Sequence, residues 1–202
     1  MHELVRSQRD WLRELTGSRP AVLQNACNLL WSNLTDKKTV EAADFAEQLR
    51  RQTSHYFEQD WSFSTPEEKK AMLLIALSRL EGKVPGREYN LGGLDVLISQ
   101  MKTSDLKERA LLEEIAQGAR TVWRFRSTLF EWLVLQQIEG AKDEAELAER
   151  QKLLFGLARR DVARISNAMH LMWEKKDTIL AAVKWVGGIV GSFGKGVIAP
   201  GA

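Results

Sequence analysis

The sequence predicts a mainly α-helical protein organised in three units. Most apolar residues recur at intervals of three and four, the spacing that places side chains on one face of a helix. Seven Trp and only four Pro among 202 residues suit helices that pack through large side chains. One stretch, residues 121–126, alternates apolar and basic residues and is the best strand candidate. We therefore expect a helical bundle over residues 1–62, a helical unit with a small β-element over 63–140, and a C-terminal helix with an apolar tail over 141–202.

Composition narrows the classes of function. Hydrophobic residues make up 44% and charged residues 28% of the chain, which is enough apolar material for a core. The net charge of +2 does not by itself indicate nucleic acid or membrane binding. The single cysteine, Cys27, excludes an intramolecular disulfide, suits a reducing compartment, and is predicted to be a small buried side chain. His2, His55 and His170 lie far apart and have no further ligands at metal-binding spacing, so no metal site is expected.

Residues 1–62 are predicted to form three helices. The first runs over residues 2–15 and stops at Gly17, a residue that commonly ends helices. Pro20 begins the second helix, which runs to Leu34, because a missing backbone N–H costs nothing in the first turn. The third helix begins at Thr39 or Val40 and carries its own apolar face.

Residues 63–140 are predicted to contain four helices and one strand. Ser64 or Thr65, followed by Pro66 and two glutamates, is a strong signal for a helix start. The expected elements are a helix over 66–81, a loop over 83–93, a helix over 94–101, a helix over 104–117, a strand over 121–126 and a helix from Ser127 or Thr128 to about residue 138.

Two segments carry a resemblance to a known family. The turn Gly17-x-x-Pro20-x-x-Leu23-Gln24 resembles the lid of STAND signal-transduction ATPases, relatives of the AAA+ class. Residues 120–133 are similar to the wing and following helix of the winged-helix domain that comes after that lid. The resemblance covers about residues 1–138 and implies a lid-like unit followed by a winged-helix-like unit. It also implies that Pro20 lies against the adenine of a nucleotide when an ATPase core is supplied in cis or in trans.

The chain itself is expected to bind no cofactor and to be non-catalytic. A phosphate-binding loop requires Ser or Thr after Gly-Lys, but Gly194-Lys195 is followed by Gly196, and Ile189 stands where the first glycine of the pattern is needed. No nucleophile is placed with an acid and a base in the sequence pattern. Arg19 either reaches a phosphate or is a solvated turn residue.

The C-terminal unit carries a heptad-like apolar seam from Leu154 to Val197, which predicts packing on another helix, in this chain or in a partner. Its last part, residues 179–198, has two charges and five glycines, a composition that suits an interfacial peptide better than a membrane span. The candidate partner or membrane contacts are Ile179, Val183, Val186, Val190, Phe193, Val197, Lys184 and Lys195.

The leading hypothesis is a cytoplasmic, non-catalytic regulatory module that transmits or restrains a signal through helix packing with a protein partner or an adjoining domain. The first alternative is an effector whose segment 178–198 binds or perturbs membranes when exposed. The second alternative is a winged-helix regulator that binds DNA, which the acids within residues 104–117 disfavour because they would face phosphates. Its nucleic-acid contacts would be Lys107, Arg109, Arg124 and Arg126.

Overall fold

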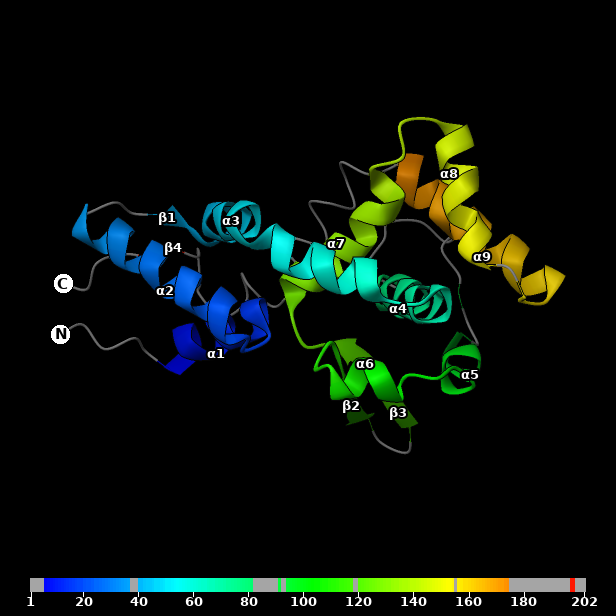
Figure 1. Ribbon diagram of the computed structural model, residues 1–202, viewed down its shortest axis with the longest axis horizontal. Helices are drawn as coiled ribbons and strands as arrows, with labels where there is room; N and C mark the ends of the chain where they lie inside the picture. Colours follow the sequence, from blue (N-terminus) through cyan, green and yellow to red (C-terminus); the bar gives the residue numbers. More distant parts are fainter. Residues whose placement is uncertain are drawn as a thin grey trace.

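The structure, a computed structural model, describes residues 6–36, 40–81, 91, 94–117, 120–154, 156–174 and 197–198. These residues form an elongated, mainly helical molecule with two small antiparallel strand pairs, which confirms the predicted fold class (Figure 1). Helix α3 runs from the narrow end of the molecule toward the wide end and joins the two (Figure 1).

Helices α1 (Arg6–Thr16), α2 (Pro20–Thr35) and α3 (Ala42–Phe63) form the narrow end, which we call the N-terminal helical unit. Pro20 occupies the first turn of α2, as predicted. Trp11 of α1 packs on Phe45 of α3 with ring centroids 5.4 Å apart. The buried face of α2 consists of Val22, Ala26, Leu29, Leu30 and Asn33.

Cys27 is exposed, so its predicted burial is wrong. Successive side chains on an α-helix point about 100° apart, because one turn takes 3.6 residues. Ala26 lies on the buried face with 0% exposure. Cys27, the next residue, is therefore rotated out of that face toward solvent.

The wide end contains α4 (Pro66–Arg79), α5 (Leu94–Ser99), α6 (Ser104–Glu108), β2 (Leu112–Gln117), β3 (Arg120–Phe125) and α7 (Thr128–Glu139), which we call the hairpin unit. The predicted start of α4 is a full capping box. The Thr65 hydroxyl accepts from the Glu68 N–H at 3.2 Å, and the Glu68 carboxylate accepts from the Thr65 N–H at 2.7 Å. The predicted loop over 83–93 lies outside the described residues except for Leu91, which is buried.

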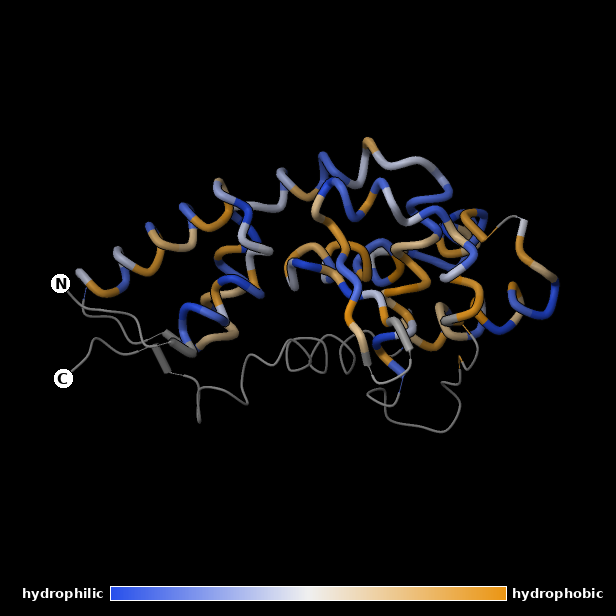
Figure 2. The backbone as a smooth tube through the Cα atoms, turned by 90° about the horizontal axis from the view of Figure 1, so that it is seen from below, coloured by the Kyte–Doolittle hydropathy of each residue, from blue (hydrophilic) through white to orange (hydrophobic). Residues whose placement is uncertain are grey.

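Helix α4 is the centre of the hairpin unit. Every residue from Ala71 to Leu77 is at most 1% exposed, so the helix is covered on all sides. Helix α7 packs beside it, and the hairpin, α5 and the 3₁₀ turn η1 (Lys152–Leu154) also contact α4. In Figure 2 the hydrophobic stretches accordingly concentrate inside the wide end of the molecule.

The predicted helix over 104–117 is wrong beyond residue 108. Helix α6 ends at Glu108, Ala110 adopts a positive φ of 55°, and strand β2 begins at Leu112. Leu111 and Ile115 have helical spacing, but β2 pairs with β3 along its whole length, from Leu112 opposite Phe125 to Gln117 opposite Arg120. Tertiary pairing thus overrides the local pattern. The predicted strand over 121–126 is confirmed as β3, within one residue.

The helical elements of the C-terminal unit among the described residues are α8 (Glu144–Gln151), η1 and α9 (Arg159–Glu174). The seam residues Ile165, Met169 and Met172 are all 0% exposed, and α9 packs on α7. Strand β4 (Val197–Ile198) pairs antiparallel with β1 (Val40–Glu41) at the narrow end. No helix among the described residues has the length and apolar character needed to cross a membrane.

Candidate functional site

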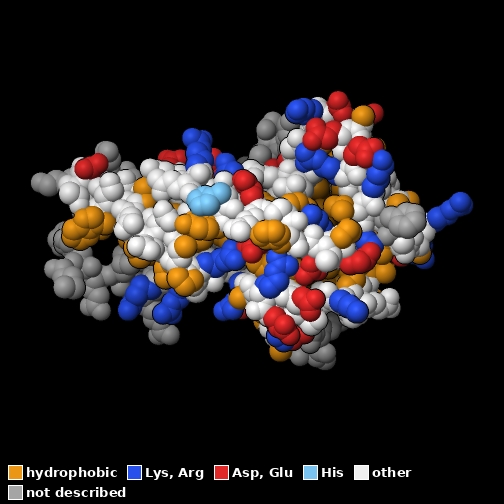
Figure 3. Space-filling model, viewed as in Figure 1, with side chains coloured by type: hydrophobic (Ala, Val, Ile, Leu, Met, Phe, Trp, Pro, Cys, Tyr) orange, Lys and Arg blue, Asp and Glu red, His pale blue; other side chains and the backbone are white. Residues whose placement is uncertain are grey.

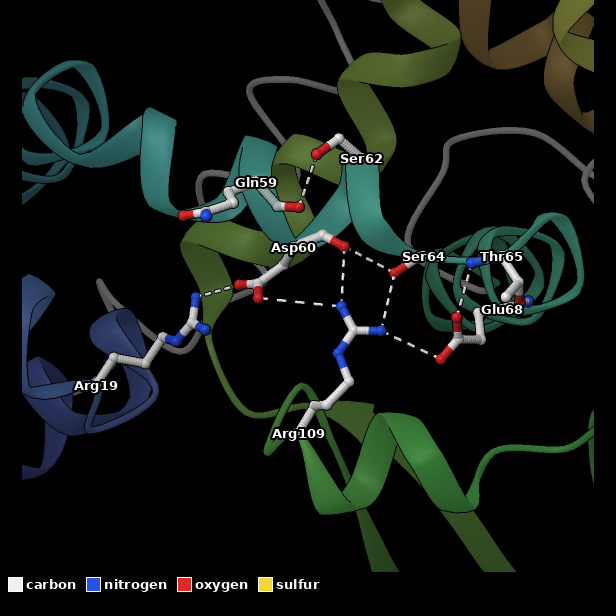
Figure 4. A network of polar contacts seen from close by, with 8 residues as sticks. All are labelled: Arg19, Gln59, Asp60, Ser62, Ser64, Thr65, Glu68 and Arg109. Atoms are coloured by element: carbon white, nitrogen blue, oxygen red, sulfur yellow. Dashed lines mark hydrogen bonds and ion pairs between the residues drawn. The ribbon is translucent and has the colours of Figure 1, made fainter.

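A network of four charged residues and one serine lies where the N-terminal helical unit meets the hairpin unit (Figure 4). It consists of Arg19, Asp60, Ser64, Glu68 and Arg109, and we call it the joint network. Its residues come from the start of α2, the last turn of α3, the α3–α4 corner, the first turn of α4 and the residue that follows α6. Segments far apart in sequence therefore meet at one point.

Arg109 is the centre of the joint network. Its guanidinium donates to Ser64 Oγ at 3.3 Å, to Glu68 Oε1 at 3.2 Å and to the Asp60 backbone carbonyl at 2.9 Å. The Asp60 carboxylate lies 4.0 Å from the same guanidinium and also accepts a short hydrogen bond from Arg19. Charges thus alternate in the order Arg19, Asp60, Arg109, Glu68, and the network has no net charge.

The joint network is partly shielded from water. The side chains of Asp60 and Glu68 are 18% and 11% exposed, and those of Arg19 and Arg109 are 29% and 31% exposed. Charge-assisted hydrogen bonds are stronger in such a setting than on an open surface, but water still reaches the arginines.

Aromatic residues form the apolar base of this contact between the units. Phe57 of α3 stacks on Phe130 of α7 at 5.8 Å between centroids, and Phe125 of β3 meets Phe130 edge-on at 5.8 Å. The Arg19 guanidinium lies 5.5 Å from the centroid of Phe57, so one residue contacts both the charged rim and the aromatic base. An apolar centre with a polar rim is the usual anatomy of an interface between folded units.

The Gly17 turn forms a second contact between the units. Gly17 has φ of +65°, and a Cβ placed there would lie 2.9 Å from Ser127 Cβ at the start of α7. Ser127 Oγ donates to the Leu15 carbonyl at 2.8 Å while it accepts from the Phe130 N–H at 3.3 Å. Pro20, the proposed adenine contact, is exposed at the first turn of α2 just after this turn.

A third contact joins α3 to α7 through Arg50. Its guanidinium lies 4.7 Å from the ring centroid of Trp132 and donates to Gln136 Oε1 at 3.4 Å. Arg50 also forms hydrogen bonds to both carboxylate oxygens of Glu47, at 2.9 and 3.0 Å. These bonds, together with one from Arg51, hold the pKa of Glu47 below its ordinary value, against the opposing effect of burial.

A polar cleft of about 270 Å³ opens between α1, the Gly17 turn and the hairpin. It is lined by Asp10, Arg13, Glu14, Gly17, Ser18, Glu113, Arg124, Phe125 and Arg126. Its three arginines face three carboxylates, and Glu113 pairs with both Arg124 and Arg126. The cleft therefore offers no surplus of positive charge to a phosphate.

Each of the four predicted nucleic-acid contacts is paired with a carboxylate. Arg124 and Arg126 share Glu113, Lys107 pairs with Glu114 at 2.6 Å, and Arg109 is in the joint network. Each of these cations faces a carboxylate, which reduces its attraction to a phosphate.

The predicted membrane contacts Ile179, Val183, Lys184, Val186, Val190, Phe193 and Lys195 lie outside the described residues, and Val197 lies in β4. Among the side chains that the structure describes, no three His, Cys, Asp or Glu residues are placed to hold a metal ion.

The sequence singles out Arg19 and Arg109 but assigns neither to the joint network. Arg19, predicted to reach a phosphate or solvent, instead pairs with Asp60. Glu68 gives a sequence signal only as the third residue of a capping box, and Asp60 gives none.

Comparison of the chain with protein-family models, with curated proteins and with solved structures finds no match. Any proposal about function therefore rests on the geometry of the described residues.

Proposed function

We propose that this protein is a non-catalytic regulatory module whose N-terminal helical unit and hairpin unit change their relative orientation when a protein partner or an adjoining domain binds. The joint network is the observation that carries the proposal. It connects α2, α3, α4 and the end of α6, and Arg109 contacts Asp60 across the two units, so a displacement of either unit must alter that contact.

The physical character of the contact supports a switchable joint. Contacts between units of one chain resemble transient protein interfaces, in which relative motion is the default unless the interface is large and apolar. Because Arg109 is 31% exposed, water can replace its contacts with Asp60 when the joint opens. A partner then needs to supply only about 1–3 kcal/mol of differential binding, the usual coupling energy between sites, to shift the orientation.

Distance measurements between spin labels test this proposal. In a Cys27→Ser background, labels at Asp44→Cys on α3 and Glu149→Cys on α8 report on the two ends of the molecule, and both positions are exposed. We expect one narrow distance distribution in the parent protein. Asp60→Asn should broaden it or add a second distance.

The matched control is Lys107→Met, which removes an ion pair outside the joint network and should leave the distribution unchanged. An excess of unlabelled protein suppresses distances between molecules. A single, unchanged distance in folded Asp60→Asn would show that the joint network does not set the orientation, and the proposal would fail.

The resemblance to the STAND lid extends the proposal. Pro20 is exposed, so it is free to meet a nucleotide that an ATPase core holds. Calorimetric titration with ATP should give no saturable binding to this chain alone, and clear binding would contradict a lid without its core.

A second proposal is that segment 178–198 acts on membranes once it is released. It rests on the composition of this segment and on the shortness of the β1–β4 pair, since two-residue strands are weak. Liposome flotation with dye leakage tests it on the full chain and on a chain that ends at Asp177. Flotation and leakage by the full chain alone would support the membrane function, and no lipid contact by either would dismiss it.

A further inference from the structure

The outward face of α2 carries no charge. None of its sixteen residues, Pro20 to Thr35, is Asp, Glu, Lys, Arg or His, although 28% of the chain is charged. The exposed residues of this helix, beyond its first turn, are Gln24, Cys27, Asn28, Trp31, Ser32 and Thr35. In Figure 3 the surface over α2 is accordingly white and orange, while Lys and Arg side chains lie below it.

Trp31 gives this face an apolar anchor. Its side chain is 73% exposed, and a tryptophan at that exposure leaves on the order of 150 Å² in water. Tryptophan is enriched and charge is depleted at the centres of protein interfaces. Phe63 at the end of α3 is equally exposed, at 74%, but lies outside this uncharged face.

We propose that this face binds the same face of a second copy of the protein, with the two α2 helices antiparallel across a two-fold axis. Charge is the first argument for this occupant. If a charged partner surface bound to α2, its charges would be removed from water without an opposite charge to pair with, which is unfavourable. An identical face carries no charge, so its binding has no such cost. This inference goes beyond the proposed regulatory function and uses none of the joint residues.

Side-chain chemistry is the second argument. The midpoint of α2 falls between Cys27 and Asn28, so a two-fold axis there places Asn28 level with Cys27 of the second copy and within one residue's rise, about 1.5 Å along the helix, of its Asn28. An amide carries both donors and an acceptor, and two identical amides can therefore satisfy one another. The same axis places Trp31 of one copy near Gln24 of the other, and the two Cys27 side chains close together.

The size of the face sets the strength of the contact. Sixteen residues make a helix of about 24 Å, which offers much less area than the ~800 Å² per partner of a standard interface. We therefore expect a weak dimer, with a dissociation constant on the order of 10–1,000 μM.

Sedimentation equilibrium over a concentration series, together with copper-catalysed oxidation of Cys27, tests the proposal. The parent protein should dimerise reversibly and form a disulfide dimer through its single cysteine, and Cys27→Ser should remove only the cross-link. Trp31→Glu should weaken association at least tenfold. The matched control Phe63→Glu should associate like the parent.

A charge-swap pair gives the sharpest test of the two-fold axis. Asn28→Asp and Asn28→Lys should each dimerise less than the parent, because like charges would face one another. Mixed together, they should associate with each other at low salt. Circular dichroism checks that each variant is folded.

Three results would overturn the proposal. One is a monomer at every concentration with no cross-link at Cys27. Another is a dimer that survives Trp31→Glu unchanged, which would place the interface elsewhere. The third is equal weakening by Trp31→Glu and Phe63→Glu, which would show that the effect is not specific to α2.

Discussion

Replacing Arg109 with methionine should lower the free energy of unfolding by about 2 kcal/mol. Methionine keeps most of the apolar stem and removes the three hydrogen bonds to Ser64, Glu68 and the Asp60 carbonyl. The Glu68 carboxylate then loses the Arg109 guanidinium as its partner, although Glu68 is only 8% exposed. Hydrogen bonds to charged groups contribute about 1.5–3 kcal/mol each when buried, but Arg109 is 31% exposed, so water recovers part of the loss.

A double-mutant cycle isolates the ion pair between Arg109 and Glu68. In a Glu68→Gln background, Arg109→Met should cost about 1 kcal/mol less than in the parent, because no buried charge is then left unpaired. The assay is urea unfolding followed by both circular dichroism and tryptophan fluorescence, which must coincide for a two-state treatment.

Lys107→Met is the control, since Lys107 and its partner Glu114 are 54% and 41% exposed. Such an exposed pair should contribute less than about 1 kcal/mol. The reasoning would be refuted if Arg109→Met destabilised the protein no more than Lys107→Met, or if the coupling energy between Arg109 and Glu68 were zero.

Three further changes have defined outcomes. Gly17→Ala should lower the melting temperature and reduce the free energy of unfolding in urea by about 2 kcal/mol. The cause is that an alanine backbone is strained at φ of +65° and its Cβ would clash with Ser127. An unchanged melting temperature would contradict this prediction. Thr65→Ala should cost about 1 kcal/mol in the same assay through loss of the α4 cap, and Thr65→Ser should restore most of it. The pKa of Glu47 is lowered mainly by Arg50, so Glu47 stabilises the fold above its ordinary pKa of 4.5, and that contribution is lost as pH falls through the lowered pKa. Glu47→Gln should therefore be less stable than the parent at pH 7, and the difference should shrink as pH falls below 4.5. A difference that stays constant with pH would argue against the assignment.

Much of the helical pattern can be predicted from local signals. Pro20 and the Thr65–Pro66 pair fix the starts of α2 and α4, because capping and the missing proline N–H act within one turn. Strand β3 is predictable from its alternation. Strand β2 is not, because Leu111, the residue before it, and Ile115 within it have helical spacing, and only pairing with β3 decides its conformation.

The joint network is beyond local prediction for the same reason. Arg109 lies 41 residues from Glu68 and 49 from Asp60 in sequence, and Arg19 lies 41 from Asp60. No pattern within a turn or a strand relates them. The α3–α4 corner is signalled locally by Thr65 and Pro66, but the end of α6 just before Arg109 depends on the pairing of β2 with β3, and only the packing of the units brings the positions together.

The pairing of β4 with β1 bears on the order in which the chain folds. Val40 and Glu41 pair with Ile198 and Val197, near the other end of the sequence. During synthesis, β1 therefore emerges long before its partner exists, whereas α1, α2 and α3 can already pack on one another. Closing so long a loop is entropically unfavourable, and the hydrogen bonds of a two-residue strand pair offset little of that cost. We expect the strand pair to form last and to open first, so that amide hydrogen exchange at β1 is faster than in the buried helix α4.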